Sequence, residues 1–336
     1  MKKALLSAAI LAALPAFAMA DSTDVQIYGR ANVSVDYLDD GASYSELNVS
    51  SNSSRLGFRA SRQFENVTGI MQIEQEIDYS NQGSNWASRD TFVGLRGNFG
   101  MFRVGKFDTP FKRARGPANL FGDQLGDMRN LTRAGAGRFD ERTPNTIHYQ
   151  SPGFSGFQAN FAYSLHEGND ANDGADDNAW SASITYKQGD LDFAAAYESF
   201  EDDRGQGGRD AFRMAAAYNI GDLTLVGFFQ TIDHSNDLFD ADVYGIGANY
   251  KISDKLAVKG QYLIRNADAD DSDSDLLSVG MEYRFGSQLR LYANYALVAN
   301  DDNARLNPWS QARTTSTPGS FGESAQGLSL GIRFDF

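Results

Sequence analysis

The sequence predicts an all-β fold, a 16-stranded antiparallel transmembrane β-barrel. Three observations support this prediction: the chain ends on a long amphipathic strand, short alternating segments recur along its whole length, and the connections between them alternate in length. The composition agrees, because the 336 residues include 23 Phe, 15 Tyr and 33 Gly but only 7 Pro. Such a composition suits a barrel whose outer face carries girdles of aromatic residues.

The last segment, Gln326 to Phe336, shows the alternation most clearly. Small or polar residues occupy every second position, and the positions between them are apolar: Leu328, Leu330, Ile332, Phe334 and Phe336. A strand with this period has one apolar face and one wet face. In a membrane barrel, the last strand pairs with the first and closes the sheet.

The first 20 residues read as a secretory signal peptide. A basic start is followed by the apolar run Ala4–Phe17 and by the small-x-small site Ala18–Ala20. We therefore expect residues 1–20 to be removed and residues 21–336 to form the barrel. The alternative is that the segment is retained as an N-terminal anchor.

Composition and charge exclude several classes of function. Without residues 1–20, the chain has 28 basic and 44 acidic side chains, a formal charge of −16, which argues against nucleic acid as a partner. Cysteine is absent, so no disulfide can stabilise the exported chain. After residue 20 there is no run of 18 apolar residues, so the sequence predicts no membrane-spanning helix.

Sixteen alternating segments follow the signal. They lie near residues 24–38, 54–65, 67–80, 88–97, 99–107, 143–151, 155–166, 179–188, 190–200, 209–219, 222–232, 241–251, 255–266, 275–285, 288–299 and 325–336. Short Gly- and Asn-containing turns such as 97–100 and 188–190 alternate with longer polar connections such as 39–53, 167–178 and 300–324. Short turns at one end and long loops at the other are typical of bacterial outer-membrane barrels.

The two faces of these segments must meet different surroundings. In the third segment, Glu74, Glu76 and Asp78 share one face, whereas Met71 and Ile73 share the other. Unpaired charges are too costly to bury in a dry core, so the charged face must meet water and the apolar face lipid or a second sheet. The faces of the fourth and fifth segments stay open. A soluble β-sandwich or propeller is the alternative, but it explains only the alternation.

One connection, about residues 108–142, is long and has no clear strand. A loop of this length in a compact protein is usually functional or disordered. This one is too apolar for a solvated tail, because it contains or adjoins Phe107, Phe111, Leu120, Phe121, Leu125, Met128, Leu131 and Phe139. We expect it to fold into the lumen and to narrow the pore.

The whole chain resembles the general, trimeric porins of Gram-negative outer membranes. The resemblance is carried by the order and spacing of segments 27–30, 54–59, 88–95, 104–106 and 142–149. It implies an outer-membrane channel for passive diffusion of ions and small hydrophilic solutes, assembled as a homotrimer. It also implies contact with membrane lipid and lipopolysaccharide, and no cofactor.

The resemblance further implies a pore constriction, in which bases on the barrel wall face acids on the third loop. By position, the wall bases are Arg30, Arg55, Arg89 and Arg142, with Lys106 behind the loop. The candidate acids on the loop are Asp123 and Asp127. The chain departs from the family pattern at Ala87, where some relatives carry a base, and in the length and sequence of the loop.

Physical reasoning supports a field at such a site. Crowded arginines stay ionised because their pKa is too high for deprotonation, and a low-dielectric wall screens them poorly. Rings of charge then set ion preference. The alternative is that each arginine merely pairs with a nearby acid. The loop also has its own bases, so the sign of the selectivity stays open: Lys112, Arg113, Arg115, Arg129, Arg133 and Arg138.

The remaining loops are acidic, for example at Asp39–Asp40, Asp170–Asp177 and Asp268–Asp273. They are interpreted as a solvated surface, or alternatively as sites where divalent cations bridge to lipopolysaccharide. An enzyme is not expected, because His148 and Ser151 lack a nucleophile motif and no metal-ligand spacing occurs. Two further hypotheses are a solute-specific, anion-preferring porin and a plugged structural or adhesin barrel.

Overall fold

The computed structural model of the chain describes residues 23–80, 87–134, 139–165, 178–202, 207–235, 237, 239–315 and 317–336. The expected signal peptide lies outside the described residues, as does the acidic stretch Asp170–Asp177. No helix among the described residues is long and apolar enough to cross a membrane.

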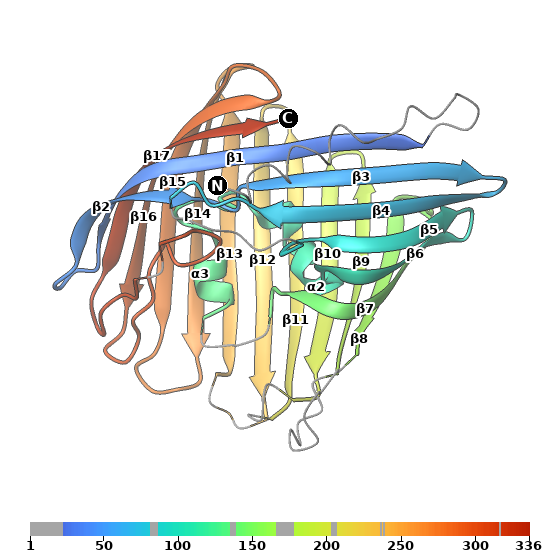
Figure 1. Cartoon of the computed structure of the whole chain (residues 1–336). Helices are drawn as coiled ribbons and strands as arrows, with labels where there is room; N and C mark the ends of the chain where they lie inside the picture. Colours follow the sequence, from blue (N-terminus) through green and yellow to red (C-terminus); the bar gives the residue numbers. More distant parts are fainter. Residues whose placement is uncertain are drawn as a thin grey trace, which may run out of the picture.

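The described chain forms one antiparallel sheet, curled into a barrel (Figure 1). Its strands are β1 (Asp24–Asp39), β2 (Ser45–Ser51), β3 (Arg55–Phe64), β4 (Val67–Glu76), β5 (Thr91–Gly97), β6 (Gly100–Asp108), β7 (Arg142–Gln150), β8 (Phe157–Ser164), β9 (Ala179–Gln188), β10 (Leu191–Phe200), β11 (Arg209–Ile220), β12 (Leu223–His234), β13 (Ala241–Lys251), β14 (Leu256–Ala267), β15 (Ser274–Arg284), β16 (Leu289–Asn300) and β17 (Ala325–Asp335). The connection between β6 and β7 contains α2 (Pro110–Ala114), the 3-10 turn η1 (Gly116–Ala118) and α3 (Arg129–Thr132).

Pairing between β1 and β17 closes the barrel. Residues 30–39 of β1 pair with residues 326–335 of β17, and Gly29 and Phe336 exchange backbone hydrogen bonds of 2.9 and 3.0 Å. On its other side, β1 pairs with β3 through its first half and with β2 through its second half. Strands β2 and β3 therefore share one position, and the prediction of a closed 16-strand antiparallel barrel is confirmed.

Strand β2 corrects the expectation of a long loop over residues 39–53. The connection from β1 to β2 covers only residues 40–44, where Asp40 Oδ1 accepts hydrogen bonds of 2.9 Å from the backbone N–H groups of Ala42 and Tyr44. The strand is rich in Ser and Asn, residues that also dominate loops, and this composition hid its alternation.

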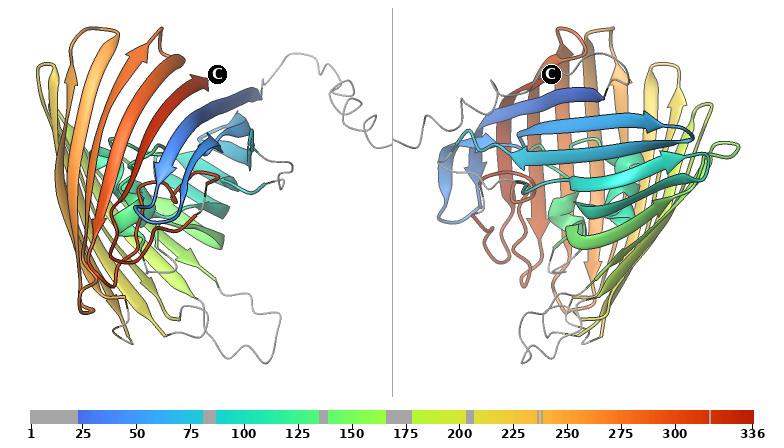
Figure 2. Two further views of the ribbon diagram at one scale, coloured as in Figure 1. Left: turned by 90° about the vertical axis from the view of Figure 1, so that its left-hand side faces the viewer. Right: turned by 45° about the vertical axis from the view of Figure 1, so that its right-hand side comes forward.

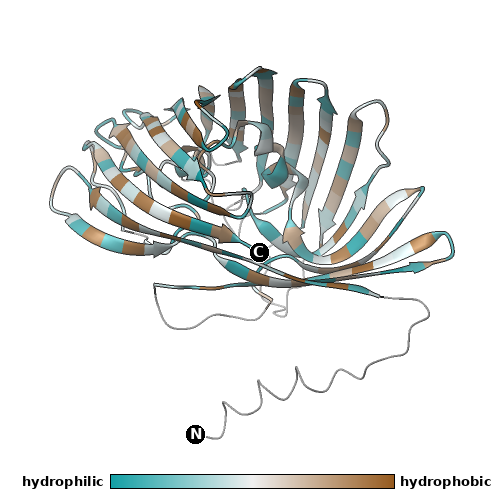
Figure 3. Ribbon diagram, turned by 90° about the horizontal axis from the view of Figure 1, so that it is seen from above, coloured by the Kyte–Doolittle hydropathy of each residue, from teal (hydrophilic) through white to brown (hydrophobic). Residues whose placement is uncertain are grey.

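The outer face is apolar and the inner face mostly polar, as the alternation predicted. Figure 3 shows hydrophobic and hydrophilic residues alternating along the strands. On the strands whose faces were open, the outward residues are Val93, Leu95, Phe102 and Val104. Exposed aromatic residues gather next to the short turns: Phe64, Phe99, Phe154, Phe157, Tyr218, Tyr250, Phe285 and Phe336. They form an aromatic girdle at one membrane interface.

Part of the inner wall is apolar and packs against the long connection between β6 and β7. Phe111 of α2 and Phe139 pack with ring centroids 5.7 Å apart against a wall of small residues that includes Ala194 and Ala211. Contacts of α2 with β8 to β11, and of α3 with β14 and β15, put both helices on the inner side of the sheet (Figure 2). Alanine is too short to fill the space above the sheet, so the aromatic rings can occupy it.

We predict that charge on the outer face destabilises the barrel according to depth. Ile246 is 72% exposed in the middle of β13, and Ile252 lies just past the end of the same strand. Ile246→Arg should lower the free energy of unfolding in lipid vesicles by about 2–4 kcal/mol, whereas Ile252→Arg should lower it by about 1 kcal/mol or less. Denaturant titration measures both values, and equal losses would contradict the predicted depth of β13.

Candidate functional site: an arginine-lined cavity inside the barrel

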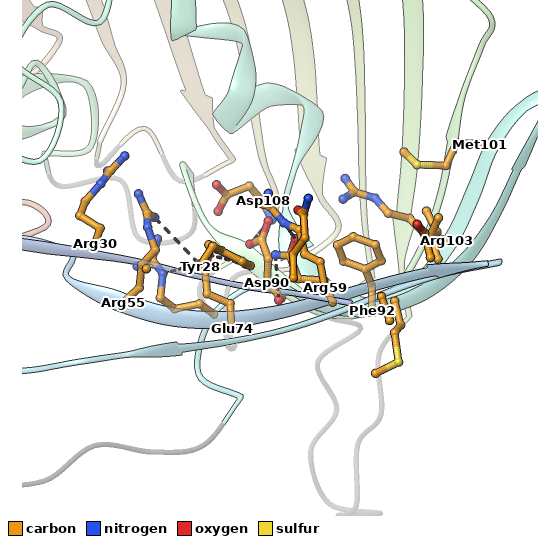
Figure 4. Close-up of a pocket in the computed structure, with 18 of the residues that line it drawn as sticks. Tyr28, Arg30, Arg55, Arg59, Glu74, Asp90, Phe92, Met101, Arg103 and Asp108 are labelled. Carbon is orange, nitrogen blue, oxygen red and sulfur yellow. Dashed lines mark hydrogen bonds and ion pairs between the residues drawn. The ribbon is translucent and has the colours of Figure 1, made fainter. Parts of the chain in front are cut away.

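A cavity of about 770 Å³ lies along the inner wall formed by β1 and β3–β7. The side chains that line it include those of Arg30, Arg59 and Arg103, which are labelled in Figure 4. Eight of them are arginines: Arg30, Arg55, Arg59, Arg89, Arg96, Arg103, Arg113 and Arg142. Five are carboxylates: Asp24, Glu74, Asp90, Asp108 and Asp335. The cavity therefore has an excess of positive charge, although the whole chain carries −14.

Glu74 organises the centre of this wall. Its Oε1 lies 2.6 Å from Arg89 Nε and 3.9 Å from Arg55 Nη1. Its Oε2 accepts a hydrogen bond of 2.9 Å from the hydroxyl of Tyr28. Because the carboxylate is buried, its contacts with these two guanidinium groups fix where the arginines point into the cavity.

Asp90 plays the same part at the next position along the wall. It pairs with the guanidinium of Arg142, and its Oδ2 lies 3.3 Å from Arg113 Nη2. Arg142 Nη2 also lies 2.8 Å from Asp108 Oδ1, at the end of β6. Arg113 belongs to α2, so this group joins the wall to the long connection.

Arg30 meets the long connection from the wall side. Its Nη1 lies 3.3 Å from Asp123 Oδ2, and its Nε lies 2.7 Å from Asp335 Oδ1 on β17. Asp123 Oδ1 is in turn 2.9 Å from Arg129 Nη2. Asp123 has a φ of +60°, a left-handed conformation that costs a side-chain-bearing residue energy and that its ion pairs help to maintain.

Two of the predicted site residues lie apart from this group. Asp127 is fully buried and binds Arg129 of its own segment, with Oδ2 and Nη2 2.6 Å apart. It therefore supports Asp123, whose backbone N–H donates to it at 2.8 Å, and does not face the wall. Lys106 is half-buried on β6, where it pairs with Thr91 of β5 in the register, and it is not among the residues that line the cavity.

Electrostatics keep the acids of the long connection ionised. Burial raises the pKa of Asp123, but the charges of Arg129, Arg55 and Arg30 outweigh burial and hold this pKa well below its usual range. Burial likewise raises the pKa of Asp140, but Arg213 and Arg115 hold it below its usual range. Both carboxylates thus carry a full charge across the physiological pH range.

The long connection is fastened to the opposite wall by a buried ion pair. Asp140 accepts hydrogen bonds of 2.6 and 2.9 Å from the two terminal nitrogens of Arg213 on β11. Arg213 Nη1 also donates to the backbone carbonyl of Phe111 at 3.1 Å, and its guanidinium lies 4.0 Å from the centroid of that ring. Arg115 adds a third contact to Asp140 at 3.2 Å.

A second long connection, residues 301–324, packs against the first. The backbone N–H of Gly126 donates to the carbonyl of Pro308 at 2.8 Å, and Gln311 N donates to Asn130 Oδ1 at 3.0 Å. Trp309 is fully buried in the apolar cluster that also holds Met128. Gly126 has a φ of +84°, and a Cβ there would collide with Ser278 on β15, so only glycine allows the approach.

The four arginines expected on the wall, Arg30, Arg55, Arg89 and Arg142, line one cavity, but the sequence did not indicate their acidic partners Glu74 and Asp90. Glu74 had been placed on a wet face, yet the strand period does not show that Arg89 and Arg55 lie beside it. Asp90 directly follows Arg89, and alternation alone places such neighbours on opposite faces. The cavity contains further arginines that were not expected there, namely Arg59, Arg96 and Arg103. In the sequence, only their positions on the polar faces of strands could have indicated that they line the lumen.

Other chemistry finds no support at this site. Within the described residues, no group of three or more His, Cys, Asp or Glu side chains could hold a metal ion. His148 is buried, accepts a hydrogen bond of 3.2 Å from Arg103 Nε and packs edge-on against Phe107, so it serves to position Arg103.

We predict that Asp140→Asn releases the long connection. The substitution leaves Arg213 charged and buried without its carboxylate, a change that costs about 3–5 kcal/mol. Trypsin should then cleave the folded protein at the bases of residues 112–133 faster than it cleaves the unsubstituted protein. Asp302→Asn, on the exposed part of the other connection, is the control and should leave cleavage unchanged. Equal protection of both variants would contradict this role for Asp140.

Comparisons with known proteins agree with this geometry. Residues 7–303 match the family model described as Gram-negative porin. The major outer membrane protein P.IB of Neisseria sicca is 31% identical over 172 residues, which cover 48% of this chain and 47% of that protein. P.IB of Neisseria lactamica is 29% identical over 219 residues, covering 62% and 61%. The chain thus spans about half to three fifths of the length of these relatives.

Solved structures resemble the chain over nearly its whole length. An anion-selective porin from Comamonas acidovorans is 25% identical and superposes with a TM-score of 0.83, covering 94% of this chain and 100% of that one. OmpF of Salmonella typhi, at 14% identity and a TM-score of 0.69 over 93% and 97%, shows the fold alone. Porins are channels, so the expectation that the chain is not an enzyme is also supported. The sheet, the matched family model and the relatives together show that this chain belongs to the family of Gram-negative porins.

Proposed function

We propose that this outer-membrane protein forms a water-filled channel for passive diffusion of ions and small hydrophilic solutes. The observation that carries the proposal is the cavity of about 770 Å³ along the inner wall, with ionised side chains held in place by neighbouring acids. A sheet of sixteen strands leaves room for water inside. Diffusion through such a lumen needs no cofactor.

The constriction of this channel lies between Arg30, Arg55, Arg89 and Arg142 on the wall and the segment from about residue 108 to residue 142. Asp123 supports this arrangement, because its Oδ2 lies 3.3 Å from Nη1 of the wall residue Arg30, and Asp108 makes a second such contact, with its Oδ1 2.8 Å from Arg142 Nη2. Asp127 contributes by holding Arg129 beside Asp123. We assign Lys106 a weaker influence, since it stands apart from the arginines.

The channel prefers anions. Eight arginines and five carboxylates line the cavity, so a passing anion meets a net positive wall. The Comamonas acidovorans porin, which is similar over nearly the whole chain, is described as anion-selective. The acidic side chains that dominate the total charge lie largely in the loops, away from this wall. A porin specific for one organic or inorganic anion is the second candidate, and the same excess of arginine favours it.

The channel assembles as a homotrimer. An OmpT of Vibrio cholerae, which shares the fold at 21% identity and a TM-score of 0.69, is described in a trimer form. On this chain, an apolar dent of about 530 Å³ on the outside of β14–β17 and β1 offers a contact surface, with Ala293 between Leu291 and Leu330. Contacts between the acidic outer loops and lipopolysaccharide, directly or through divalent cations, stay a prediction.

We predict that the wall arginines set the ion selectivity. In a KCl gradient across a planar bilayer, the reversal potential of the unsubstituted channel should have the same sign as the equilibrium potential of chloride. Replacing Arg55, Arg89 and Arg142 by Gln leaves five arginines beside five carboxylates. The chloride-over-potassium permeability ratio should then fall roughly tenfold, since the focusing field is lost.

Arg305→Gln is the matched control for this measurement. Arg305 is an exposed residue of the connection 301–324, with its guanidinium 4.8 Å from the centroid of the Phe321 ring, and it does not line the cavity. Its removal should leave the reversal potential unchanged. An equal shift in both proteins would assign the selectivity to total charge, and folded protein without conductance would favour a plugged barrel.

We also predict that Ala293→Arg disrupts the trimer. The large, charged arginine side chain would fill the apolar dent and place a charge in it, so subunits could no longer pack there. Native mass measurement in detergent should give trimers for the unsubstituted protein and monomers for the variant. Ile252→Arg, a similar substitution near a short turn on β13, should stay trimeric. Trimers in both variants would place the subunit contact elsewhere.

A further inference from the structure

Three arginines near the short turns face one another directly across adjacent strands. Arg284 of β15 is opposite Arg290 of β16, and Arg290 is opposite Arg333 of β17. All three stand on the inner face. Like charges directly opposite each other destabilise a sheet, so this row is unfavourable for the fold itself. Such local costs are typical of positions kept for a function.

Too few carboxylates accompany this row to neutralise it. Glu282 Oε1 lies 2.6 Å from Arg284 Nε and 3.3 Å from Arg290 Nη1. Asp335 Oδ2 lies 2.8 Å from Arg333 Nε and 3.6 Å from Arg290 Nη2. Asp335 already binds Arg30 through its other oxygen, at 2.7 Å. Glu282 and Asp335 are thus shared among the three arginines of the row and Arg30, and Arg30 also pairs with Asp123.

A second cavity, of about 400 Å³, lies over this row. It is separate from the arginine-lined cavity described above, and Arg30 lines both of them. Its wall comes from β12–β17 and β1, and its roof from residues 115–124 of the long connection. Six bases line it, namely Arg30, Arg115, Lys259, Arg284, Arg290 and Arg333, against the two acids Asp123 and Glu282.

Two of these bases hold the roof. Lys259 Nζ donates to the carbonyl of Leu120 at 2.7 Å and to Gln124 Oε1 at 2.8 Å. Arg115 binds Asp140 through Nη1, while its buried Nε has no hydrogen-bond partner among the described residues. An unsatisfied buried donor is costly for the fold.

We propose that this second cavity is an anion-binding site for a small, doubly charged oxyanion such as phosphate. Neighbouring strands lie about 4.8 Å apart. Guanidinium groups on such strands can bind several oxygens of one anion through paired N–H donors. The proposal rests on the proposed channel function, because the cavity lies on the short-turn side of the constriction. An anion that has passed Arg30 would next meet Arg333 and Arg290.

Phosphate binding to the refolded full-length barrel in detergent tests the proposal, with isothermal titration calorimetry as the readout. Arg290→Gln and Arg333→Gln should each weaken phosphate binding roughly tenfold, because each removes charge-assisted hydrogen bonds. Arg284→Gln, at a half-exposed side chain, is the variant with the least risk to folding and should weaken binding in the same direction.

Lys187→Gln is the matched control. Lys187 lies at the same end of the barrel on β9, is 78% exposed and pairs with Asp192 at 3.0 Å, so its loss makes the same charge change away from the cavity. Unchanged phosphate binding in this variant supports the site. Equal weakening in Lys187→Gln and Arg290→Gln would overturn it, because the effect would then be that of total charge. The proposal would also be overturned if phosphate binding were lost only in the triple variant in which Arg55, Arg89 and Arg142 are replaced by Gln.

Conductance of the same preparations separates the two proposals. KCl conductance without phosphate binding would overturn the second site and leave the channel intact. Phosphate binding without conductance would support the site and contradict the channel. When both occur, phosphate should reduce the chloride current in the unsubstituted protein and in Lys187→Gln, but about tenfold higher phosphate should be needed in Arg290→Gln.

Discussion

The hydrogen bonds between β1 and β17 are the interactions on which the rest of this structure depends. In a bilayer no water is available to satisfy a strand edge, so the sheet must close on itself. Closure in a single register also decides which side chains face inward, because a slip of one residue turns every side chain to the other face. With Arg30 opposite Asp335, the arginines of the wall point into the lumen. A slip would place them in lipid.

The two halves of the inner wall are built differently. Along β9–β12, alanines leave space that the long connection fills with Phe111 and Phe139, and Arg213 fixes it there. Along β1 and β3–β7, charged side chains line open space over most of the wall. The larger cavity therefore lies along a charged wall, with low-dielectric packing along β9–β12. This geometry concentrates the field of the arginines.

Strand positions were predictable from the sequence because a period of two is a local property. Each of the sixteen expected segments corresponds to one strand. The additional strand, the Ser- and Asn-rich β2, was not expected, and it shares a barrel position with β3. The apolar residues of the long connection indicated that it packs against other parts of the protein. The alternation could not show that they pack against alanines of β10 and β11. That requires knowing which inner-wall positions lie beneath the connection.

The site was predictable only in part for the same reason. Arg55, Arg89 and Arg142 could be placed by resemblance, whereas their partners Glu74 and Asp90 become neighbours through cross-strand register, which no local pattern contains. Asp127 is a candidate acid of the constriction by sequence, but in the structure it pairs with Arg129, two residues away, and not with an arginine of the wall. The row Arg284, Arg290 and Arg333 likewise exists only when three strands are aligned.

The ion pair between Arg30 and Asp335 spans the seam where the barrel closes. Before closure, each of these side chains belongs to a free edge, and an inward-pointing charge on an edge strand discourages pairing with another chain. At this one position of the register the two edges carry opposite charges, so they suit each other there. The residues that tune the lumen in the finished barrel thus also protect the unfinished sheet from joining its neighbours.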